Sequence, residues 1–578
     1  MSWIIGISGY IDKDLQETIK KLTPQPLYKI EQNNLFIVAG GNQQTCIMAN
    51  NLSSEEQIIA IGVGLKKSGI EFDFLAKDDW LNFTNEKQLN NLNGHFVIIK
   101  WDNNEIKIFT DKLGLRDIYV CKNSQNGILF STRIDWLLKI INTKINFKEF
   151  GSRWLLFNQI SSNSVFDGIE RIGSGKSVFI DRKANIISIN KKNWLPVFSE
   201  QNFSPDDFSN TLEQLIMFPL LHNQRISLSL SGGMDSRVIL SFLLKNNYTN
   251  WYAHTFGDKN SPDSVVVNKI ISDHNIHHEQ IDLPFPDIYG CLKEIREYVS
   301  ATIINSEASA IIQLRNYNTL AGRDEVIIDG GFGEIWRRDF FNRLLITGYK
   351  SLINKNTKEI LPHMKYFRAN IFNDEINNIM WQGSEEQLQN IFNELPRIED
   401  IGAENWVDLF AIKTRLSNYY SYEQARLDSL LFGYMPFIQP SLLENIFNLK
   451  INHRKNGKLF KYLISKNFKD LTKYPLAKGQ LTYPFWFNTL LSRIWKISAK
   501  KLKVKLYNDN RAEKLIQTLS PFILDSINSS SVKECEFYNY PRLLSLSNSL
   551  TKNEITNDEI NELDWWLSFE IFRQENNI

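Results

Sequence analysis

Two patterns of hydrophobic and polar residues divide the chain. Over roughly the first 190 residues, short apolar or β-branched runs alternate with Asn- and Gly-rich turns, a pattern that predicts strands. The predicted strands are Trp3–Gly9, Leu35–Gly40, Gly94–Trp101, Glu105–Thr110, Ile118–Cys121 and Gly127–Ser131. Lys176–Ile180 and Ile186–Ile189 flank a short polar turn and predict a hairpin. We therefore expect an α/β or sandwich-like domain whose strands are mostly antiparallel.

After a polar segment at Pro196–Pro205, strands begin to alternate with helices. The predicted strands are Ile226–Leu230, Trp251–Phe256, Glu279–Leu283 and Glu325–Asp329, and the predicted helices are Phe208–Leu221, Met234–Asn246, Pro262–His274 and Asp287–Ser300. Such alternation is typical of a parallel, doubly wound sheet. From about Phe340 the chain reads as mostly helical, and the helically spaced stripe Trp565, Trp566, Phe569 and Phe572 predicts a helix docked on a core. We expect two domains, residues 1–200 and 201–578.

Composition narrows the class of protein. The 578 residues carry 66 Lys and Arg against 65 Asp and Glu, a balance that argues against a dedicated nucleic-acid binder. No run of about 18 apolar residues predicts a membrane span, and the N-terminus lacks the basic region of a signal peptide. The four cysteines are far apart, which argues against a disulfide scaffold or a zinc site. The expectation is a cytoplasmic enzyme.

The segment 225–237, RISLSLSGGMDSR, carries the most specific chemistry. A predicted buried strand leads into Ser231, Gly232 and Gly233, and a helix begins near Asp235 and Ser236. Glycines allow close approach of a ligand, and hydroxyls with free N–H groups at a helix start bind polyanions. Asp235 would repel phosphate, so its place in the loop indicates a Mg²⁺ ligand. The alternative is an ordinary strand-to-helix turn capped by Asp or Ser.

SGGMDS resembles the pyrophosphate loop of ATP pyrophosphatases. The resemblance implies that ATP is cleaved between its α- and β-phosphates, that a carboxylate becomes an acyl-adenylate, and that an amine then displaces AMP. It also implies which residues bind ATP: Ser231, Gly232, Gly233, Ser236 and Arg237 the pyrophosphate, and Thr255, Phe256 and Gly257 the adenine. Asp263 is a weaker match, and a plain acid at a helix N-terminus is its alternative.

Three further segments are similar, in order and spacing, to the class II glutaminase half of the asparagine synthetase family. They are Leu92–Phe96, Thr110–Tyr119 and Phe130–Asp135. The resemblance implies an Ntn-type αββα sandwich. The family nucleophile is a Cys directly after the initiator Met, whereas this chain has Ser2 and lacks an N-G-E-x-Y-N segment. Between a Ser-based amidase and a degenerate structural domain, the second is favoured, as in β-lactam synthetases and lasso-peptide cyclases.

The region Ile328–Trp336 resembles the family's S-G-[ED]-G-x-D-E-x-F loop. The resemblance implies that Glu334 is a second Mg²⁺ ligand, with Asp329 as a substitute. Gly330 and Gly333 stand where the family has acids, so the alignment identifies no catalytic base.

Two later segments complete the resemblance. Arg415–Pro440 is similar to the family segment that lines the acceptor side, but its charged residues are replaced by Gly433, Tyr434 and Gln439, which indicates a pocket rebuilt for another substrate. Arg426 is either a phosphate or carboxylate contact or a solvated helix charge. Tyr474–Gln480 is similar to the R-x-K-x-G loop, which implies that Lys478 stabilises charge on the α-phosphate and the leaving pyrophosphate.

Together these patterns predict an ATP- and Mg²⁺-dependent carbon–nitrogen ligase. Lys478 and Glu334 would be catalytic, and Asp235 and Glu334 would hold the metal. The substrates would be a small-molecule or peptide carboxylate and an amine, as in natural-product or macrolactam synthesis, and not glutamine. The alternatives are an asparagine synthetase or sugar amidotransferase that uses ammonia, and a nucleotide-binding pseudoenzyme subunit. A homodimer or a partner maturation protein is compatible with the sequence.

Overall fold

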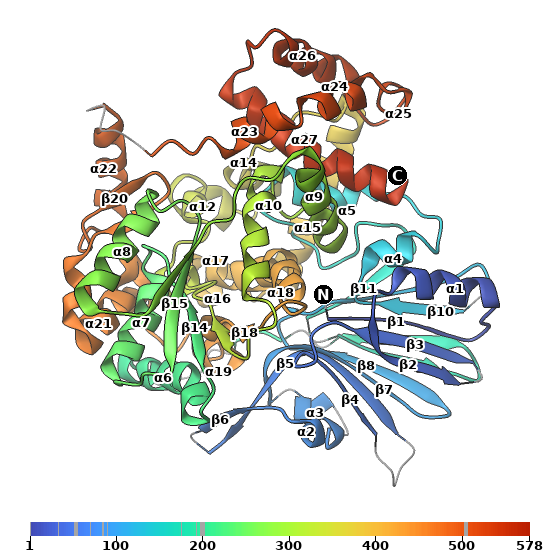
Figure 1. Cartoon of the computed structure of the whole chain (residues 1–578), viewed down its shortest axis with the longest axis horizontal. Coiled ribbons are helices and arrows are strands. Elements are labelled where there is room, and N and C mark those ends of the chain that lie inside the picture. Colours follow the sequence, from blue (N-terminus) through green and yellow to red (C-terminus); the bar gives the residue numbers. More distant parts are fainter. Residues whose placement is uncertain are drawn as a thin grey trace.

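The computed structural model describes residues 2–32, 34–50, 56–69, 71–83, 86–89, 91–125, 127–174, 176–191, 194–196, 203–501 and 507–578. Within these ranges, the N-terminal part contains two antiparallel sheets, and the later residues form a parallel sheet surrounded by many helices (Figure 1). The predicted α/β class, with the parts in this order, is confirmed. The predicted boundary near residue 200 falls at 197–202, outside the described residues.

The two antiparallel sheets stack on each other. Over the described residues, one has the strand order β11-β9-β10-β1-β3-β2 and the other the order β13-β12-β8-β7-β5-β4, with β6 paired to β5. The strands are β1 (Trp3–Ser8), β2 (Pro26–Gln32), β3 (Leu35–Gly40), β4 (Cys46–Asn50), β5 (Gln57–Ser68), β6 (Glu71–Phe74), β7 (Asn93–Trp101), β8 (Glu105–Thr110), β9 (Ile118–Lys122), β10 (Ile128–Ser131), β11 (Ile169–Ile172), β12 (Lys176–Asp181) and β13 (Ile186–Lys191). The predicted hairpin is the antiparallel pair β12 and β13.

Strand β1 shows why this part folds as layers. Ile4 packs between the two sheets with Ile37 and Ile61, whereas Trp3 and Ile5 face a second core on the other side. Successive side chains of a strand point to opposite faces, so a strand buried on both faces is apolar throughout. The sequence WIIGIS of β1, buried at every position, has that character.

Helices cover both outer faces of this sandwich. Trp80 of α2 (Lys77–Leu81) and Leu89 of α3 (Glu86–Leu89) pack on the seven-stranded sheet. α1 (Lys13–Leu22), α4 (Ile134–Leu138) and α5 (Phe147–Leu155) contribute to the core on the six-stranded sheet. The predicted αββα layering is therefore confirmed.

The second half contains a five-stranded sheet in the order β16-β15-β14-β17-β18, and every neighbouring pair is parallel. Its strands are β14 (Ile226–Ser229), β15 (Trp251–Phe256), β16 (His278–Ile281), β17 (Val326–Ile328) and β18 (Phe432–Tyr434). The connecting helices are α6 (Pro205–Leu221), α7 (Asp235–Lys245), α8 (Pro262–His274) and α9 (Ile288–Thr302). The strand order reverses direction between β14 and β17, and ligands of doubly wound sheets bind outside the carboxyl ends of the strands at such a point.

The remaining described chain is mainly helical. Its elements are α10 (Ala308–Leu314), η1 (Arg315–Leu320), α11 (Glu334–Arg337), α12 (Asn342–Thr347), α13 (Tyr349–Ile353), α14 (Thr357–Met364), α15 (Asp374–Glu394), α16 (Ile398–Ile401), α17 (Ala403–Ala411), a π-helical stretch η2 (Ile412–Tyr420), α18 (Ser421–Leu427), η3 (Pro436–Ile438), α19 (Pro440–Leu443), α20 (Ile451–Arg454), η4 (Lys455–Gly457), α21 (Lys458–Asn467), η5 (Lys469–Lys473), the hairpin β19 (Leu476–Lys478) and β20 (Leu481–Tyr483), α22 (Thr489–Lys501), α23 (Arg511–Thr518), α24 (Ser520–Asn528), α25 (Ser530–Lys533), α26 (Tyr540–Thr551) and α27 (Asn557–Asn576). None of the described helices is long and apolar enough to cross a membrane.

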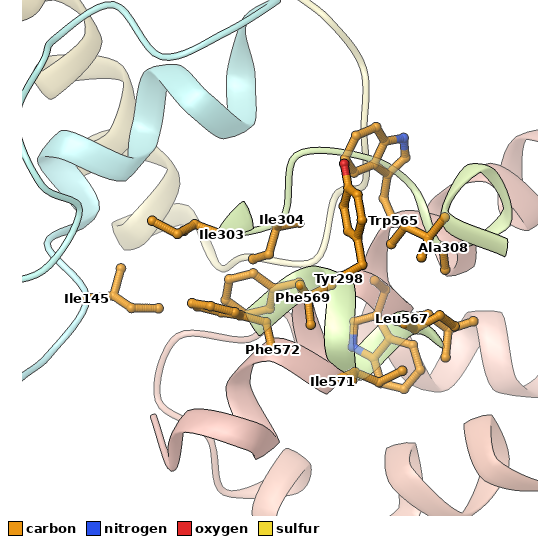
Figure 2. Packing of buried hydrophobic residues seen from close by; sticks show 14 of the residues in the cluster. Ile145, Tyr298, Ile303, Ile304, Ala308, Trp565, Leu567, Phe569, Ile571 and Phe572 are labelled. Atoms are coloured by element: carbon orange, nitrogen blue, oxygen red, sulfur yellow. The ribbon is translucent and has the colours of Figure 1, made fainter. Parts of the chain in front are cut away.

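Helix α27 joins the two halves through one shared core (Figure 2). Its side chains Trp565, Phe569 and Phe572 are almost fully buried, together with Ile145 from the N-terminal half and Ile303 from the end of α9. The prediction that this aromatic stripe docks a helix on a core is confirmed. Because the core continues across both halves, contacts made by the N-terminal half can fix positions in the second half.

Candidate functional site

The loop between β14 and α7 lies at the carboxyl end of the parallel sheet. The Oγ atoms of Ser231 and Ser236 are 3.1 Å apart, and the N–H of Gly233 donates to Ser231 Oγ over 3.2 Å. Helix α7 begins at Asp235, and no side chain caps the N–H groups of its first turn. Unpaired N–H groups at a helix start are a favourable site for an anion. The loop thus has the geometry of a phosphate site.

Two neighbouring segments hold this loop in place. The N–H of Gly232 donates to Asp263 Oδ1 over 2.9 Å, and its carbonyl accepts from the N–H of Ala477 over 2.9 Å. A Cβ on Gly232 would lie only 2.7 Å from Ala477 Cβ, so the close packing requires glycine. Asp263 is therefore more than a helix-start acid, because it fixes the backbone of the loop.

A cavity of about 840 Å³ opens beside the loop at the carboxyl ends of β14, β15 and β16. Four predicted ATP-binding residues line it: Ser231, Thr255, Phe256 and Gly257. Gly257 has a φ of +91°, a conformation that favours glycine and lets the chain turn at the cavity edge. Three basic residues, Arg315, Arg511 and Lys514, also line the cavity. Its volume lies in the range of small-molecule and cofactor sites.

Arg237 has a different position from the one predicted. Its guanidinium is fully buried and donates to the carbonyls of Gly232, Tyr474 and Pro475 over 3.0, 2.9 and 2.7 Å. It does not line the cavity. The two terminal nitrogens of Arg237 therefore join the loop between β14 and α7, here called the Ser-Gly loop, to the segment that precedes Lys478, because backbone oxygens of both accept their hydrogen bonds.

A chain of alternating charges runs along one side of the loop. Arg337 binds both oxygens of Asp235, over 2.6 and 2.9 Å, and its third nitrogen lies 2.7 Å from Asp339 Oδ2. The Nζ of Lys478 is 3.3 Å from the same oxygen of Asp339. Burial acts to raise the pKa of Asp339, but the charges of Arg337 and Lys478 outweigh it and lower that pKa. The structure thus brings Lys478 and Asp235 to one place and adds Arg337 between them.

Glu334 belongs to the same cluster. Burial raises the pKa of Glu334, and the nearby charge of Asp235 raises that pKa further. A Cβ at Gly333 would lie 2.5 Å from Asp235 Cγ, so the side chain of Asp235 occupies the space that a residue other than glycine would need. The predicted pair Asp235 and Glu334 is therefore close together. The guanidinium of Arg337, however, already occupies the position between this pair and Lys478.

These residues do not fit a Mg²⁺ ion held by the protein alone. Mg²⁺ requires near-octahedral oxygen ligands, yet both oxygens of Asp235 are engaged by Arg337. Across the described part of the chain, no group of three or more His, Cys, Asp or Glu side chains is arranged to hold a metal ion. The binding of Mg²⁺ by Asp235 and Glu334 stays a prediction.

A second cavity, of about 310 Å³, lies at the carboxyl ends of β17 and β18. It is lined mainly by apolar and aromatic side chains, including Tyr317, Tyr419, Tyr420, Leu427, Leu431, Tyr434 and Met435. Asp329 lines this cavity and forms a hydrogen bond with Ser229, which lines the larger one. Burial raises the pKa of Asp329. The two cavities therefore lie side by side where the strand order of the sheet reverses.

Arg426 lines a further cavity, of about 370 Å³, and its side chain is mostly buried. Its side chain is 13 % exposed, and its Nε is 3.2 Å from Glu423 Oε2. The guanidinium also lies over the rings of Tyr298 and Tyr317. The interpretation of Arg426 as a solvated helix charge is therefore wrong.

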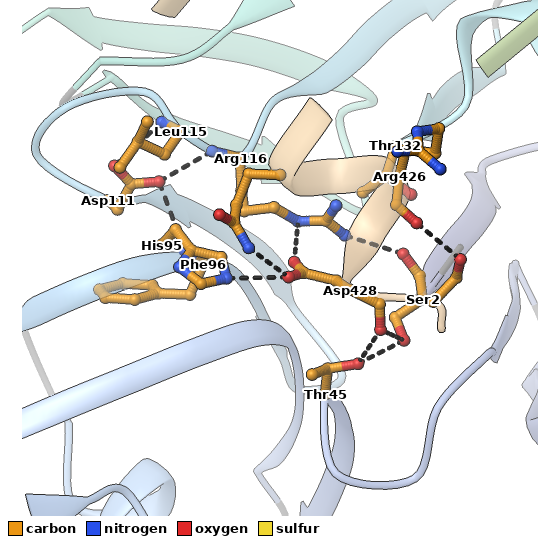
Figure 3. A network of polar contacts seen from close by, with 12 residues as sticks. Ser2, Thr45, His95, Phe96, Asp111, Leu115, Arg116, Thr132, Arg426 and Asp428 are labelled. Atoms are coloured by element: carbon orange, nitrogen blue, oxygen red, sulfur yellow. Dashed lines mark hydrogen bonds and ion pairs between the residues drawn. The ribbon is translucent and has the colours of Figure 1, made fainter. Parts of the chain in front are cut away.

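Ser2, the residue at the predicted nucleophile position, lies in a buried polar network (Figure 3). Its Oγ is 2.6 Å from Thr45 Oγ1 and donates to the carbonyl of Asp428 over 3.2 Å. The carboxylate of Asp428 is 2.9 Å from His95 Nε2 and 3.4 Å from Arg116 Nε. A residue from the second half of the chain thus fills the polar centre of the N-terminal domain.

Comparisons with known proteins agree with the N-terminal fold. Residues 81–194 match the family model of a glutamine amidotransferase domain. Together with the two antiparallel sheets, the match indicates that the fold of the N-terminal part is similar to that of a glutamine amidotransferase domain, and we refer to this part as the amidotransferase-type domain. No curated protein sequence matches the chain.

Two solved structures give weak likenesses. One is glutamine phosphoribosylpyrophosphate amidotransferase from B. subtilis complexed with ADP and GMP, with 7% identity, 49% of this chain and 91% of that chain covered, and a TM-score of 0.23. The other is described as the allosteric regulatory enzyme of purine biosynthesis, with 7% identity, 40% and 54% covered, and a TM-score of 0.20. Likenesses at these TM-scores carry no conclusion.

Proposed function

We propose that this protein is an ATP-dependent amide-forming ligase that activates a carboxylate as an acyl-adenylate and transfers it to an amine. The observation that carries the proposal is the Ser-Gly loop beside an 840 Å³ cavity at the carboxyl ends of parallel strands. The resemblance of SGGMDS to the pyrophosphate loop supports ATP as the ligand of that cavity. The amidotransferase-type domain supports membership of an amidotransferase-related enzyme class.

In this proposal each part of the site has one task. The hydroxyls of Ser231 and Ser236 and the N–H groups at the start of α7 receive the phosphates. Lys478 and Arg337 supply positive charge where the pyrophosphate leaves. Thr255, Phe256 and Gly257 border the space for the adenine. Mg²⁺ enters the proposal only as the ion that accompanies ATP in solution.

The lining of the second cavity favours a substrate with an apolar or aromatic group. Most of its lining is Tyr, Leu and Met, and its polar groups include the carboxylates of Asp329 and Glu423. Asp329 lies at the junction of the cavities, and a carboxylate of raised pKa is suited to accept a proton from an attacking amine. This lining favours a natural-product or peptide substrate over aspartate. The second carboxylate of aspartate would need a cation, and no Lys or Arg side chain of the described residues lines this cavity.

The test is pyrophosphate release from ATP in the presence of panels of carboxylates and amines. Lys478→Ala is a suitable variant, because the Lys478 side chain is 69 % exposed and its loss should not affect folding. Lys473→Ala is the matched control, since Lys473 is equally exposed in the same region but pairs with Asp470. We expect Lys478→Ala to lower turnover by about 10²–10³-fold and Lys473→Ala to leave it unchanged. Binding of ATP by the wild-type protein without pyrophosphate release for any pair of substrates would refute the ligase and favour the nucleotide-binding pseudoenzyme. Failure to bind ATP at all would refute both.

A further inference from the structure

Asp428 is a buried acid at the contact between the two halves of the chain. Its side chain is 1 % exposed, and its carbonyl accepts hydrogen bonds from the hydroxyls of Ser2 and Thr45, over 3.2 and 2.6 Å. The carboxylate faces His95 and Arg116, as Figure 3 shows. Backbone and side chain of one residue thus engage four side chains of the amidotransferase-type domain.

Asp428 is also the counterion that this centre requires. Burial acts to lower the pKa of Arg116, and among the nearby charges Asp428 opposes that effect most strongly. Two other acids are close by. Asp117 is paired with Arg171, and Asp111 has its oxygens occupied by the N–H groups of Leu113, Leu115 and Arg116. A buried guanidinium without a partner is costly, so Asp428 is strongly held in this position.

The N-terminal half also contacts the chain a few residues before Asp428. Arg171 of β11 donates to Asn418 Oδ1 over 2.6 Å and also to the carbonyl of Ser417. The guanidinium groups of Arg153 and Arg171 lie 4.5 and 5.2 Å from the ring centre of Tyr422. Asn418, Tyr422 and Asp428 are all buried. The stretch from residue 417 to residue 428 is therefore fixed at both ends.

The opposite side of this stretch forms a wall of the 310 Å³ cavity. Tyr419, Tyr420, Glu423, Gln424 and Leu427 line the cavity, whereas Asn418 and Tyr422 contact the N-terminal half. Residues four apart lie on one side of a helix, so this segment presents one side to the N-terminal half and another side to the cavity. Part of this segment is the π-helical η2, a form that often occurs at functional sites.

We propose that Asp428 is a positioning residue that occupies the polar centre of the amidotransferase-type domain and holds the cavity wall 417–428 in place. The domain then serves substrate binding in the second half and does not bind glutamine. This inference rests on the proposed function for the meaning of the cavity, but the position of the wall can be measured without any reaction.

The experiment is hydrogen–deuterium exchange on the full-length protein, followed in peptides that cover residues 412–431. We expect Asp428→Ala to raise exchange there by about tenfold or more, because Arg116 and His95 lose their partner. Asp428→Asn should give an intermediate rise, since it keeps a hydrogen-bonding side chain. Thr45→Val removes only one hydroxyl and should give a small rise, which keeps the test open if Asp428→Ala does not fold. Glu570→Gln is the control, because Glu570 is buried and paired with Arg573 in α27.

Two further readouts separate this inference from the ligase itself. Binding of a non-hydrolysable ATP analogue should be unchanged in the Asp428 variants, and with an identified substrate their effect should be on KM for that substrate and not for ATP. Ser2→Cys should release no ammonia from millimolar L-glutamine. Unchanged exchange in 412–431, a rise spread equally over the whole protein, or glutamine hydrolysis by Ser2→Cys would each overturn the inference.

Discussion

Arg337 offers the sharpest test of how charge is arranged at the proposed phosphate site. Its guanidinium binds Asp235 through two contacts and Asp339 through one. Replacing Arg337 by Met keeps an elongated apolar side chain but removes the charge. Asp235 and Asp339 would then lose the cation that they share, and Asp339 would keep only its contact with Lys478.

The size of the effect follows from the geometry. Two unit charges about 4 Å apart interact by about 4 kcal/mol at an effective dielectric constant of about 20. The side chains of Arg337 and Asp235 are each 18 % exposed, so water screens part of this interaction and its energy falls to about 2–3 kcal/mol. At about 1.4 kcal/mol per tenfold change, that is a loss of about 30- to 150-fold in pyrophosphate-forming activity.

The same variant changes the number of metal ions at the site. With the guanidinium removed, Asp235 and Asp339 lose the cation that they share, and a divalent cation that is also bound by the phosphates of ATP can take its place. We expect Mn²⁺ binding, measured by electron paramagnetic resonance with a non-hydrolysable ATP analogue, to give one ion per nucleotide in the wild type and a second in Arg337→Met. Raised Mg²⁺ or Mn²⁺ should restore part of the lost activity.

Two results would refute this reasoning. One is a wild-type protein that binds two Mn²⁺ ions per nucleotide, with one lost in Asp235→Asn, since Asp235 would then hold a metal despite Arg337. The other is full activity of Arg337→Met without added metal, since Arg337 would then contribute no charge to the reaction.

Two further predictions concern other positions. Gly333→Ala places a Cβ 2.5 Å from Asp235 Cγ and should weaken the binding of an ATP analogue, measured by calorimetry, by about 1–3 kcal/mol. In the control variant Gly331→Ala the new Cβ meets the flexible Met435 Sδ first, so the loss of binding free energy should be smaller. Equal affinities of the two variants would contradict the crowding argument. Burial raises the pKa of Asp564 to about 7, so the folded state binds a proton that the unfolded state loses above about pH 4. The free energy of unfolding should therefore fall between about pH 4 and 7 by an amount on the order of 4 kcal/mol. Asp564→Asn, which can still bond to Ser309, should flatten the dependence of the thermal midpoint on pH over that range. An unchanged slope in this variant would contradict the assignment of the effect to Asp564.

Local signals explain why much of the fold could be predicted. The predicted strand Ile226–Leu230 and helix Met234–Asn246 lie within a residue or two of β14 and α7, because glycine punctuation and apolar runs mark both ends. The predictions missed β2, β4, β5, β6, β11, β18, β19 and β20. Strand β18 has only three residues and is defined by its parallel pairing with β17, about 100 positions earlier. Pairing over such a separation leaves no periodic pattern in the short segment itself.

The candidate site shows the same limit. Residues within one loop, such as Ser231 and Ser236, were found because their spacing is local. Arg337 was missed because its contact with Asp235 spans 102 positions, and the contact between Ser2 and Asp428 spans 426. Arg237 was assigned to phosphate by its place in the motif, but the carbonyls of the 471–475 segment reach it first. Only the assembled structure shows which of these partners meet.

Two departures from the asparagine synthetase pattern that the sequence resembles are each matched by a compensating contact, and this bears on whether the chain is a decayed enzyme. Gly333 lacks the family acid, and the absence of a side chain there leaves space for Asp235 to receive Arg337. Ser2 replaces the family nucleophile, and the carbonyl of Asp428 accepts its hydroxyl. Loss of function without selection would leave buried charges unpaired, which is strongly destabilising. Instead Asp235 and Arg116 each have a partner, and the Ser-Gly loop keeps its hydroxyls beside an open cavity. Paired replacements of this kind favour an enzyme adapted to a different substrate over a pseudoenzyme.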